Sequence, residues 1–237
     1  MTISHPRNIT NAEFLVGYPR SGNNWTIALL QLLIGKEVRD ANDPHKTRKD
    51  YVLNRLDLPL DESKPILYRA HDWPRALRKI DTKNNKLIVV IRNFKECLVR
   101  HNQYSPKQLL KATVGDGGEF KRYEKILKLF ERWDENNRFM IFYEDLILYP
   151  KKTVACLLDF LDEKPDHMDE FFENFDYWKN KTLTSYKNQH GHKNSSGGKS
   201  PIFHIKDFPL KTLKKIDNHI KKTHPLLWKK YLYRYES

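Results

Sequence analysis

The sequence has few cysteines, few glycines and no long hydrophobic run. Only two of its 237 residues are cysteines, Cys97 and Cys156, so it can form no disulfide framework. Neither has a second cysteine or a histidine at metal-ligand spacing, and we expect both to be buried as small hydrophobic side chains. No apolar run approaches the roughly 20 residues that a membrane-spanning helix needs, and residues 1–13 lack the apolar core of a secretion signal. We therefore expect a cytoplasmic protein without a membrane span.

The chain also has fewer acidic residues than basic ones. Lysine and arginine number 43 against 30 aspartates and glutamates, which gives a formal net charge of +13 at pH 7. Such an excess favours anionic partners, such as a charged nucleotide, an anionic glycan or nucleic acid, and by itself it does not choose among them. Hydrophobic residues make up 39% of the chain and aromatic residues 12%, enough for a buried core, so disorder of the whole chain is excluded.

The apolar segments alternate between strand and helix patterns. Short, nearly continuous apolar runs, typical of strands buried on both faces, occupy residues 14–18, 66–71, 86–92 and 139–145. Apolar spacing and boundary residues predict helices over residues 24–33, 94–103, 119–135, 151–161 and 210–231. This alternation is typical of an α/β fold with a parallel sheet. We expect one domain over residues 1–237, with a tail at 1–13 and C-terminal helices at 204–237 that pack against it.

A short glycine loop joins the first predicted strand to the first predicted helix. Residues 17–24 read GYPRSGNN, and the two glycines have the spacing of a phosphate-binding P-loop. A strand, a glycine loop and a helix in this order aim backbone N–H groups and the helix dipole at an anion. The lysine and hydroxyl residue that a nucleoside triphosphatase uses for phosphate and Mg²⁺ are replaced by Asn23 and Asn24. With Arg20 inside the loop, the sequence predicts a metal-independent site for a phosphate-like group.

The loop and three later segments together resemble one enzyme family. The residues YPRSGNNW at 18–25 resemble the 5′-phosphosulfate loop of sulfotransferases that use 3′-phosphoadenosine-5′-phosphosulfate (PAPS) as donor. The family's later motifs are matched in the same order by RAH at 69–71, LIVVIRNFKECLVR at 87–100 and FYEDL at 142–146. The resemblance implies a P-loop-like nucleotide-binding fold, PAPS as the sulfuryl donor, 3′,5′-adenosine bisphosphate (PAP) as its product, and no metal.

The resemblance also assigns contacts with the donor. The residues that would hold the 5′-phosphosulfate are Arg20, Ser21, Gly22, Asn23 and Asn24. The residues that would bind the 3′-phosphate are Arg92, Arg100, Gly197, Gly198 and Lys199. The residues that would surround the adenine are Trp25, Tyr143 and Tyr186. Family members usually have serine where this chain has Arg100, so Arg100 either strengthens phosphate binding or points to a different partner.

Three residues are candidates for the chemistry. His71 ends a predicted strand at the carboxyl edge of the sheet, where α/β folds bind ligands, and a neutral imidazole can accept a hydroxyl proton near pH 7. In the family register His71 is the general base, Arg20 stabilises the oxygen that bridges sulfur and the 5′-phosphate, and Arg69 contacts the sulfuryl group. Glu144 and Asp145 include a second candidate base, but we expect one of them to anchor neighbouring backbone or a basic side chain.

We therefore predict a sulfotransferase that moves the sulfuryl group of PAPS in line to an acceptor hydroxyl or amine. Two alternatives remain: a noncatalytic module that binds nucleic acid or a sulfated glycan through its lysine-rich C-terminal helices, and a small-molecule kinase, which the missing P-loop lysine disfavours. The predicted partner is a small-molecule or glycan acceptor, with no nucleic acid, and monomer and homodimer are equally open. Acceptor contacts would come from the polar segments 39–60, 72–78, 103–118 and 188–203, with 103–118 as a lid.

Overall fold

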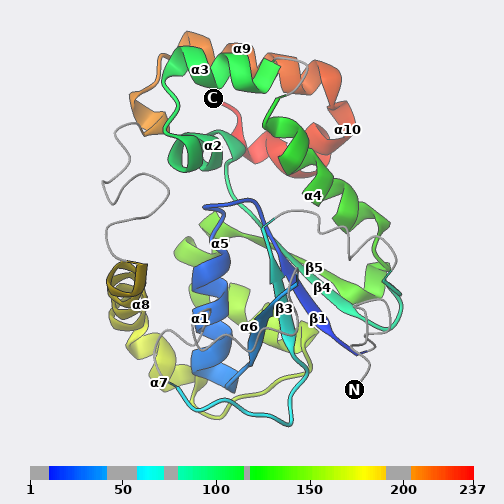
Figure 1. The fold of residues 1–237 in the computed structure, drawn as a ribbon, viewed down its shortest axis with the longest axis vertical. Helices are drawn as coiled ribbons and strands as arrows, with labels where there is room; N and C mark the ends of the chain where they lie inside the picture. The colour runs from blue at the N-terminus through cyan, green and yellow to red at the C-terminus, as the bar shows by residue number, and fades with distance from the viewer. Residues whose placement is uncertain (1–10, 42–57, 72–79, 115–117, 191–203) are drawn as a thin grey trace.

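A parallel sheet of five strands lies at the centre of the fold (Figure 1). The computed structural model describes residues 11–41, 58–71, 80–114, 118–190 and 204–237, with backbone alone for 185–190. The strands are β1 (Glu13–Val16), β2 (Val38–Asp40), β3 (Leu67–Ala70), β4 (Lys86–Ile91) and β5 (Arg138–Phe142). Their order is β2-β3-β1-β4-β5 and every pair of neighbours is parallel, which confirms the predicted α/β fold. Because β1 is central, the glycine loop leaves the middle of the carboxyl edge.

The strands differ from the prediction in two places. Strand β2 was not expected, because its three half-buried residues, Val-Arg-Asp, are too short and polar to form an apolar run. Strand β5 ends at Phe142, and Tyr143–Leu148 forms helix α5, so the predicted strand over 139–145 is wrong at its end. Glu144 and Asp145 therefore lie in the first turn of a helix, where the helix dipole stabilises carboxylates.

Helices connect and follow the strands. Those in the described residues are α1 (Asn23–Ile34), α2 (Phe94–Asn102), α3 (Pro106–Val114), α4 (Phe120–Arg132), α5, α6 (Pro150–Phe160), α7 (Met168–Glu173), α8 (Phe175–His190), α9 (Leu210–Thr223) and α10 (Pro225–Leu227). Short 3-10 or π turns occupy Glu135–Asn137, Ile205–Asp207, Trp228–Leu232 and Tyr233–Tyr235. The predicted helices are confirmed to within a few residues, and the last one divides at His224, before Pro225, whose ring nitrogen cannot donate a helical hydrogen bond.

Two segments differ from their expected form. Residues 106–114, in the segment 103–118 that we expect to contact the acceptor, form α3, a helix that packs against α9, and the acceptor contact stays a prediction. Cys97 is buried as expected, but Cys156 is exposed on α6. Helix α6 buries the face that carries Val154 and Leu157, and Cys156 lies on another face. The residue type at a single position does not reveal which face of a helix it occupies.

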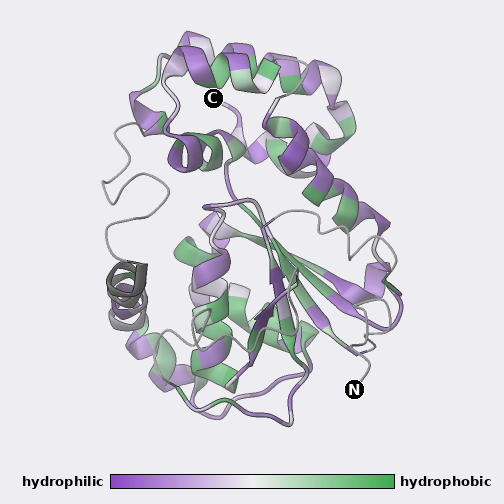
Figure 2. Ribbon diagram, viewed as in Figure 1, coloured by the Kyte–Doolittle hydropathy of each residue, from purple (hydrophilic) through white to green (hydrophobic). Residues whose placement is uncertain are grey.

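Each face of the sheet carries its own hydrophobic core. Along β4, Leu87 and Val89 face one core while Ile88 and Val90 face the other, as the alternation of side chains along a strand requires. Helices α2, α3, α4 and α9 contribute to the first core, and α1, α6, α7 and α8 to the second. Figure 2 shows the consequence: the strands are mostly hydrophobic, whereas the helices mix hydrophobic and hydrophilic residues.

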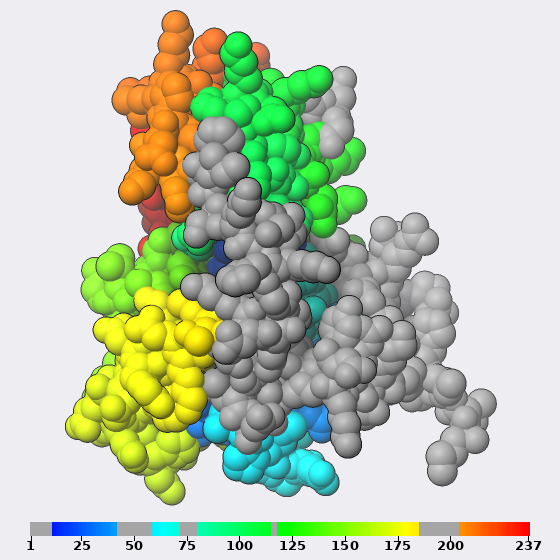
Figure 3. Space-filling view, turned by 60° about the vertical axis from the view of Figure 1, so that its left-hand side comes forward, coloured from blue at the N-terminus to red at the C-terminus, as the bar shows by residue number. Residues whose placement is uncertain are grey.

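The C-terminal helices pack with the segment that follows β4. Helices α3 and α9 lie side by side at the top of the molecule, green and orange in Figures 1 and 3. Ile216 of α9, with Trp228 and Leu232 of the following turn, belongs to the same core as Val16 of β1. The carboxyl edge of the sheet therefore faces this layer of helices. Among the helices of the described residues, none is long and apolar enough to cross a membrane.

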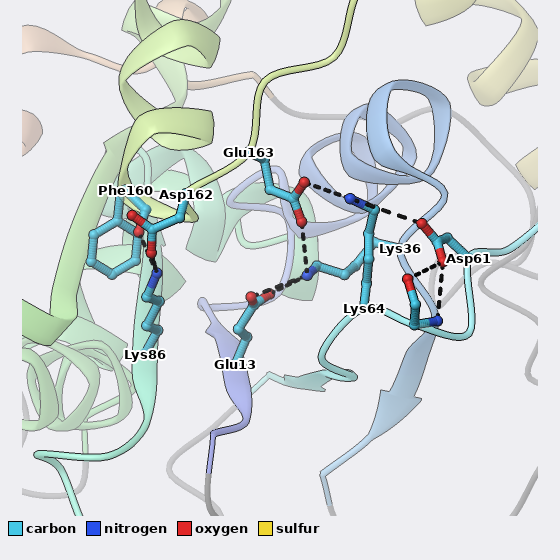
Figure 4. Close-up of polar contacts among 9 residues, drawn as sticks. Glu13, Lys36, Asp61, Lys64, Lys86, Phe160, Asp162 and Glu163 are labelled. Carbon is cyan, nitrogen blue, oxygen red and sulfur yellow. Dashed lines mark hydrogen bonds and ion pairs between the residues drawn. The ribbon is translucent and has the colours of Figure 1, made fainter.

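Charged side chains tie the opposite, amino edge of the sheet together (Figure 4). The ammonium of Lys36 is fully buried and lies 3.0 Å from Glu13 Oε2 on β1 and 4.0 Å from Glu163 Oε1. Lys64 Nζ lies 2.5 Å from the other oxygen of Glu163. Burial raises the pKa of Glu13, although Lys36 acts in the opposite direction. This network lies at the far end of β1 from the glycine loop.

Candidate active site

The glycine loop is braced by its own side chains. Asn23 occupies the place of the P-loop lysine, and its Nδ2 donates to the carbonyls of Gly17, at 3.1 Å, and Ala70, at 3.4 Å. The hydroxyl of Ser21 donates to Asn23 Oδ1 at 3.1 Å. Helix α1 begins at Asn23, so the N–H groups at its start point toward the loop. The loop therefore offers backbone donors to an anion, while the asparagine holds the loop in shape.

Backbone conformation and close packing explain the residues of this loop. Gly22 has φ +116°, and Arg20 has φ +72°, which is unusual for a residue with a side chain. A Cβ atom on Gly17 would lie 2.2 Å from Asn23 Oδ1 and 2.7 Å from the carbonyl oxygen of Val90. Both glycines are thus required by geometry, and Arg20 holds a strained backbone conformation inside the loop.

Arg92 joins the glycine loop to the start of α5. It follows β4, and its Nη1 donates to the carbonyl of Arg20 at 3.4 Å. Its guanidinium carbon lies 4.4 Å from the centre of the Tyr143 ring. The hydroxyl of Tyr123 donates to the backbone carbonyl of Arg92 at 2.6 Å and holds the turn in place. Three motifs, spread over more than a hundred residues of the sequence from Arg20 to Tyr143, therefore meet at the carboxyl edge of the sheet.

Arg92 and Arg100 converge on one carboxylate. Glu96 Oε1 lies 3.3 Å from Arg100 Nη1 and 3.7 Å from Arg92 Nη2. Its other oxygen accepts a hydrogen bond from the backbone N–H of Ile205 at 3.3 Å. The sequence analysis did not single out Glu96, although its position four residues after one arginine and four before the other indicates one helical face. The structure thus brings both arginines predicted to bind phosphate to the same place.

His71 and Arg69 lie at the carboxyl end of β3, beside the loop. Ala70 pairs with Val16 of β1, and its carbonyl accepts from the N–H of Gly17 at 3.3 Å, so the half-buried His71 follows directly at the start of the loop. Arg69 Nη2 lies 3.3 Å from Asp40 Oδ2, and this guanidinium is largely buried. Asp40 was not predicted, because it belongs to the unexpected strand β2.

A family model described as Sulfotransferase domain matches residues 11–226. The chain belongs to the sulfotransferase family. Curated relatives include sulfotransferase 1E1 of Cavia porcellus, 24% identical over 206 residues that cover 73% of this chain and 67% of the relative. Sulfotransferase 2A1 of Rattus norvegicus is 25% identical over 202 residues, with 73% and 68% covered. The family predicted from the loop and its three companion motifs is confirmed.

Solved structures support the same fold. Mouse sulfotransferase SULT7A1 complexed with PAP superposes with a TM-score of 0.60 at 17% identity, covering 94% of this chain and 87% of the other. Retinol dehydratase in a complex with retinol and PAP has a TM-score of 0.56 at 14% identity, with 92% and 82% covered. The P-loop-like fold is confirmed, and a PAPS-dependent sulfotransferase is confirmed at the level of the family. The kinase and the noncatalytic module are therefore disfavoured.

The adenine-side residues of this sulfotransferase are described in part. Trp25 is only 8% exposed and packs edge-on against Phe175 at 5.4 Å, inside the second core. Its indole N–H is buried without a hydrogen-bond partner among the described residues. The side chain of Tyr186 and the loop residues Gly197, Gly198 and Lys199 lie outside the described residues, so their donor contacts stay predictions.

The acidic pair of the sulfotransferase anchors other segments, as we expected for one of its members. Glu144 Oε1 accepts from the backbone N–H of Asn93 at 3.1 Å, and its Oε2 accepts from the hydroxyl of Tyr235 at 2.8 Å. Asp145 accepts from both terminal nitrogens of Arg234, at 2.9 and 2.5 Å. Both carboxylates are thus engaged in structural contacts. Within the described ranges, no cluster of three or more histidine, cysteine, aspartate or glutamate side chains could hold a metal ion.

Proposed function

We propose that this chain transfers the sulfuryl group of PAPS in line to a hydroxyl, or less often an amine, with His71 as general base. The acceptor oxygen forms a bond to sulfur while the bond from sulfur to the bridging oxygen of PAPS breaks. His71 takes the proton of the acceptor, and the electron pair of the broken bond remains on the 5′-phosphate of PAP. What carries the proposal is the contact of Arg92 with both the Arg20 carbonyl and the Tyr143 ring, which joins three donor motifs.

The glycine loop would stabilise the leaving group. Negative charge develops on the bridging oxygen, and the backbone N–H groups of Gly22, Asn23 and Asn24 would donate to it, whereas that of Ser21 already donates to the carbonyl of Tyr18 at 3.0 Å. The Arg20 side chain would add a positive charge that cannot be lost by deprotonation, so we assign it electrostatic stabilisation and no proton transfer. Arg69 would reach the transferring sulfuryl group, with Asp40 holding its guanidinium in position.

The 3′-phosphate of the donor would bind to Arg92 and Arg100. Their convergence on Glu96 supports this role, because it holds both guanidiniums close enough to grip one phosphate together. Gly197, Gly198 and Lys199 would close over the same phosphate. Trp25, Tyr143 and Tyr186 would contact the adenine, and the buried indole N–H of Trp25 is a donor that a nucleotide acceptor could satisfy.

Donor binding is tested by thermal shift. PAP should raise the melting temperature without added metal. At a concentration one hundred times its Kd, it should increase the free energy of unfolding by about 3 kcal/mol. ATP with Mg²⁺ should have little effect, since the loop lacks the lysine and hydroxyl that Mg-ATP requires. Stabilisation by Mg-ATP alone would instead favour the small-molecule kinase.

The general base is tested by His71→Ala. This variant should lose turnover by at least about two orders of magnitude, the usual contribution of a general base, while its affinity for PAP stays close to the wild-type value. His167→Ala is the matched control, because His167 contacts the carbonyl of Leu32 near the end of α1 that is remote from the loop. Retained turnover in His71→Ala would remove His71 as the base.

The acceptor is proposed to be a small molecule with a hydroxyl or amine, or else a glycan. Most of segment 39–60 and all of segment 72–78, in which we expect acceptor contacts, lie outside the described residues. A panel of phenols, steroids, primary alcohols, amines and glycans with labelled PAPS would identify the class. The cytoplasmic location and the oligomeric state, monomer or homodimer, stay predictions.

A further inference from the structure

A tyrosine close to the C-terminal end of the chain is bonded to the donor site through one carboxylate. The hydroxyl of Tyr235 donates to Glu144 Oε2 at 2.8 Å. The other oxygen of Glu144 accepts from the N–H of Asn93 at 3.1 Å. Asn93 directly follows Arg92, so a single carboxylate connects Tyr235 with the turn that carries Arg92.

A second contact holds the same two segments together. The guanidinium of Arg234 makes a two-pronged hydrogen bond with Asp145 and lies 4.2 Å from the centre of the Phe142 ring. Asp145 and Phe142 stand on either side of Tyr143 and Glu144. Planar guanidinium and carboxylate groups paired at two points fix direction as well as distance. Arg234 thus sets the position of the α5 start, from which Tyr143 reaches Arg92.

The backbone of Tyr235 is held by Lys95 of α2. The ammonium of Lys95, which is fully buried, donates to the carbonyl of Tyr235 at 2.8 Å and to Asp217 Oδ1 at 2.6 Å. Tyr235 is 6% exposed. Burial, and then the negative charge of Glu144, raise the pKa of Tyr235, which favours the protonated hydroxyl that donates to Glu144.

We infer that Tyr235 is a positioning residue for the donor: through Glu144 it holds the Arg92–Asn93 turn so that the Arg92 guanidinium faces the glycine loop. The inference rests on the proposed function, because it assumes that Arg92 binds the nucleotide. In this role Tyr235 acts through Glu144 and does not touch the reacting atoms. Its loss should therefore weaken donor binding and leave the chemical step unchanged once the donor is saturating.

The test compares Tyr235→Phe with Tyr231→Phe. Tyr231 donates its hydroxyl to Glu131 on α4, so the control removes the same kind of tyrosine–glutamate bond at a place without contact to the donor motifs. The Kd for PAP is measured by calorimetry, and KM for PAPS and kcat by turnover with an acceptor. Tyr235→Phe should raise both Kd and KM by about tenfold, the effect of one hydrogen bond to a charged group, with kcat within about twofold. Tyr231→Phe should change none of them.

Each other outcome has a distinct meaning. Equal Kd values for PAP in Tyr235→Phe and wild type would overturn the inference, and so would a loss of kcat without a change in KM. Should Tyr235→Phe fail to fold, Glu144→Gln in the full chain takes its place and should raise the Kd for PAP while kcat is retained. Failure of wild-type protein to bind PAP would instead defeat the proposed function, and the inference with it.

Discussion

The aromatic ring of Tyr143 lies directly against the backbone of Gly22. A Cβ atom at Gly22 would come within 2.4 Å of Tyr143 Cδ2, which is shorter than any normal contact. Gly22 is also the N-cap residue of α1, with φ +116°, in a region that residues with a side chain rarely adopt. The same ring lies 4.4 Å from the Arg92 guanidinium carbon, so the glycine loop, Tyr143 and Arg92 depend on one another.

Gly22→Ala should therefore disrupt donor binding as well as stability. The added methyl group must displace Tyr143, which in turn moves the partner of Arg92, and the strained backbone costs about 1–2 kcal/mol more. Calorimetry with PAP should detect no binding, or a Kd higher by at least about a hundredfold. Gly35→Ala is the control: Gly35 also has positive φ, +62°, but it ends α1 far from the loop, so only the melting temperature should fall. Unchanged binding in Gly22→Ala would contradict this account of the loop.

Arg92→Ala should weaken PAP binding by about ten- to a hundredfold, the range expected for a charged hydrogen bond. Arg100→Ala should have a smaller effect, about three- to tenfold, because the Arg100 side chain is 33% exposed against 18% for Arg92 and water screens it more. The control is a ligand: adenosine 5′-monophosphate lacks the 3′-phosphate, so its affinity should fall less than that of PAP in both variants. If Arg92→Ala lost the same factor of affinity for PAP and for adenosine 5′-monophosphate, Arg92 would bind a part of the donor other than the 3′-phosphate.

Lys95→Met should destabilise the protein by about 3–5 kcal/mol, the usual result of removing one partner of a buried ion pair. Lys95 and Asp217 are both buried, at 0% and 3% side-chain exposure, and their charged atoms are 2.6 Å apart. Denaturant unfolding measures the change. Lys128→Met removes a pair with Glu124 in which the lysine is 60% exposed, and it should cost no more than about 0.5 kcal/mol. A similar loss of unfolding free energy in Lys95→Met and Lys128→Met would show that burial of the ion pair does not determine its contribution to stability.

Stability should also depend on pH through Glu131. Burial raises the pKa of this carboxyl, but hydrogen bonds from Tyr231 and Lys230 outweigh it and leave the pKa below its ordinary value of 4.5. A lowered pKa in the folded state gives stability that is present above pH 4.5 and is lost as the pH falls through the folded-state pKa. Tyr231→Phe should thus lower the melting temperature by about 1–2 °C at pH 7, because it removes a partly exposed hydrogen bond, and by less at pH 3. A larger melting-temperature difference between Tyr231→Phe and wild type at pH 3 than at pH 7 would refute this pH dependence.

Local patterns were sufficient for the regular elements. The apolar runs behind β1, β3 and β4 and the spacing behind α1 and α4 depend on neighbours along the chain, and these elements lie where expected. The exceptions have physical causes. Strand β2 has three residues and lies at the edge of the sheet in the described residues, next to β3. In α3 the buried residues Leu109 and Thr113 lie among lysines and a glutamine, so neither element has a clear apolar pattern.

The sequence by itself determined the family and the glycine loop. Both rest on residue types at short spacing, because a glycine required by its backbone angle or an arginine inside a turn can be recognised without knowing what lies across the fold. Only the tertiary structure decided which groups hold the site in place. Glu144 and Tyr235 are 91 residues apart in the chain and meet because the sheet and the C-terminal helices share one core, and the partnership of Arg69 with Asp40 depends on the parallel pairing of β2 with β3. Such contacts follow from how elements pack against one another, which residue order alone does not specify.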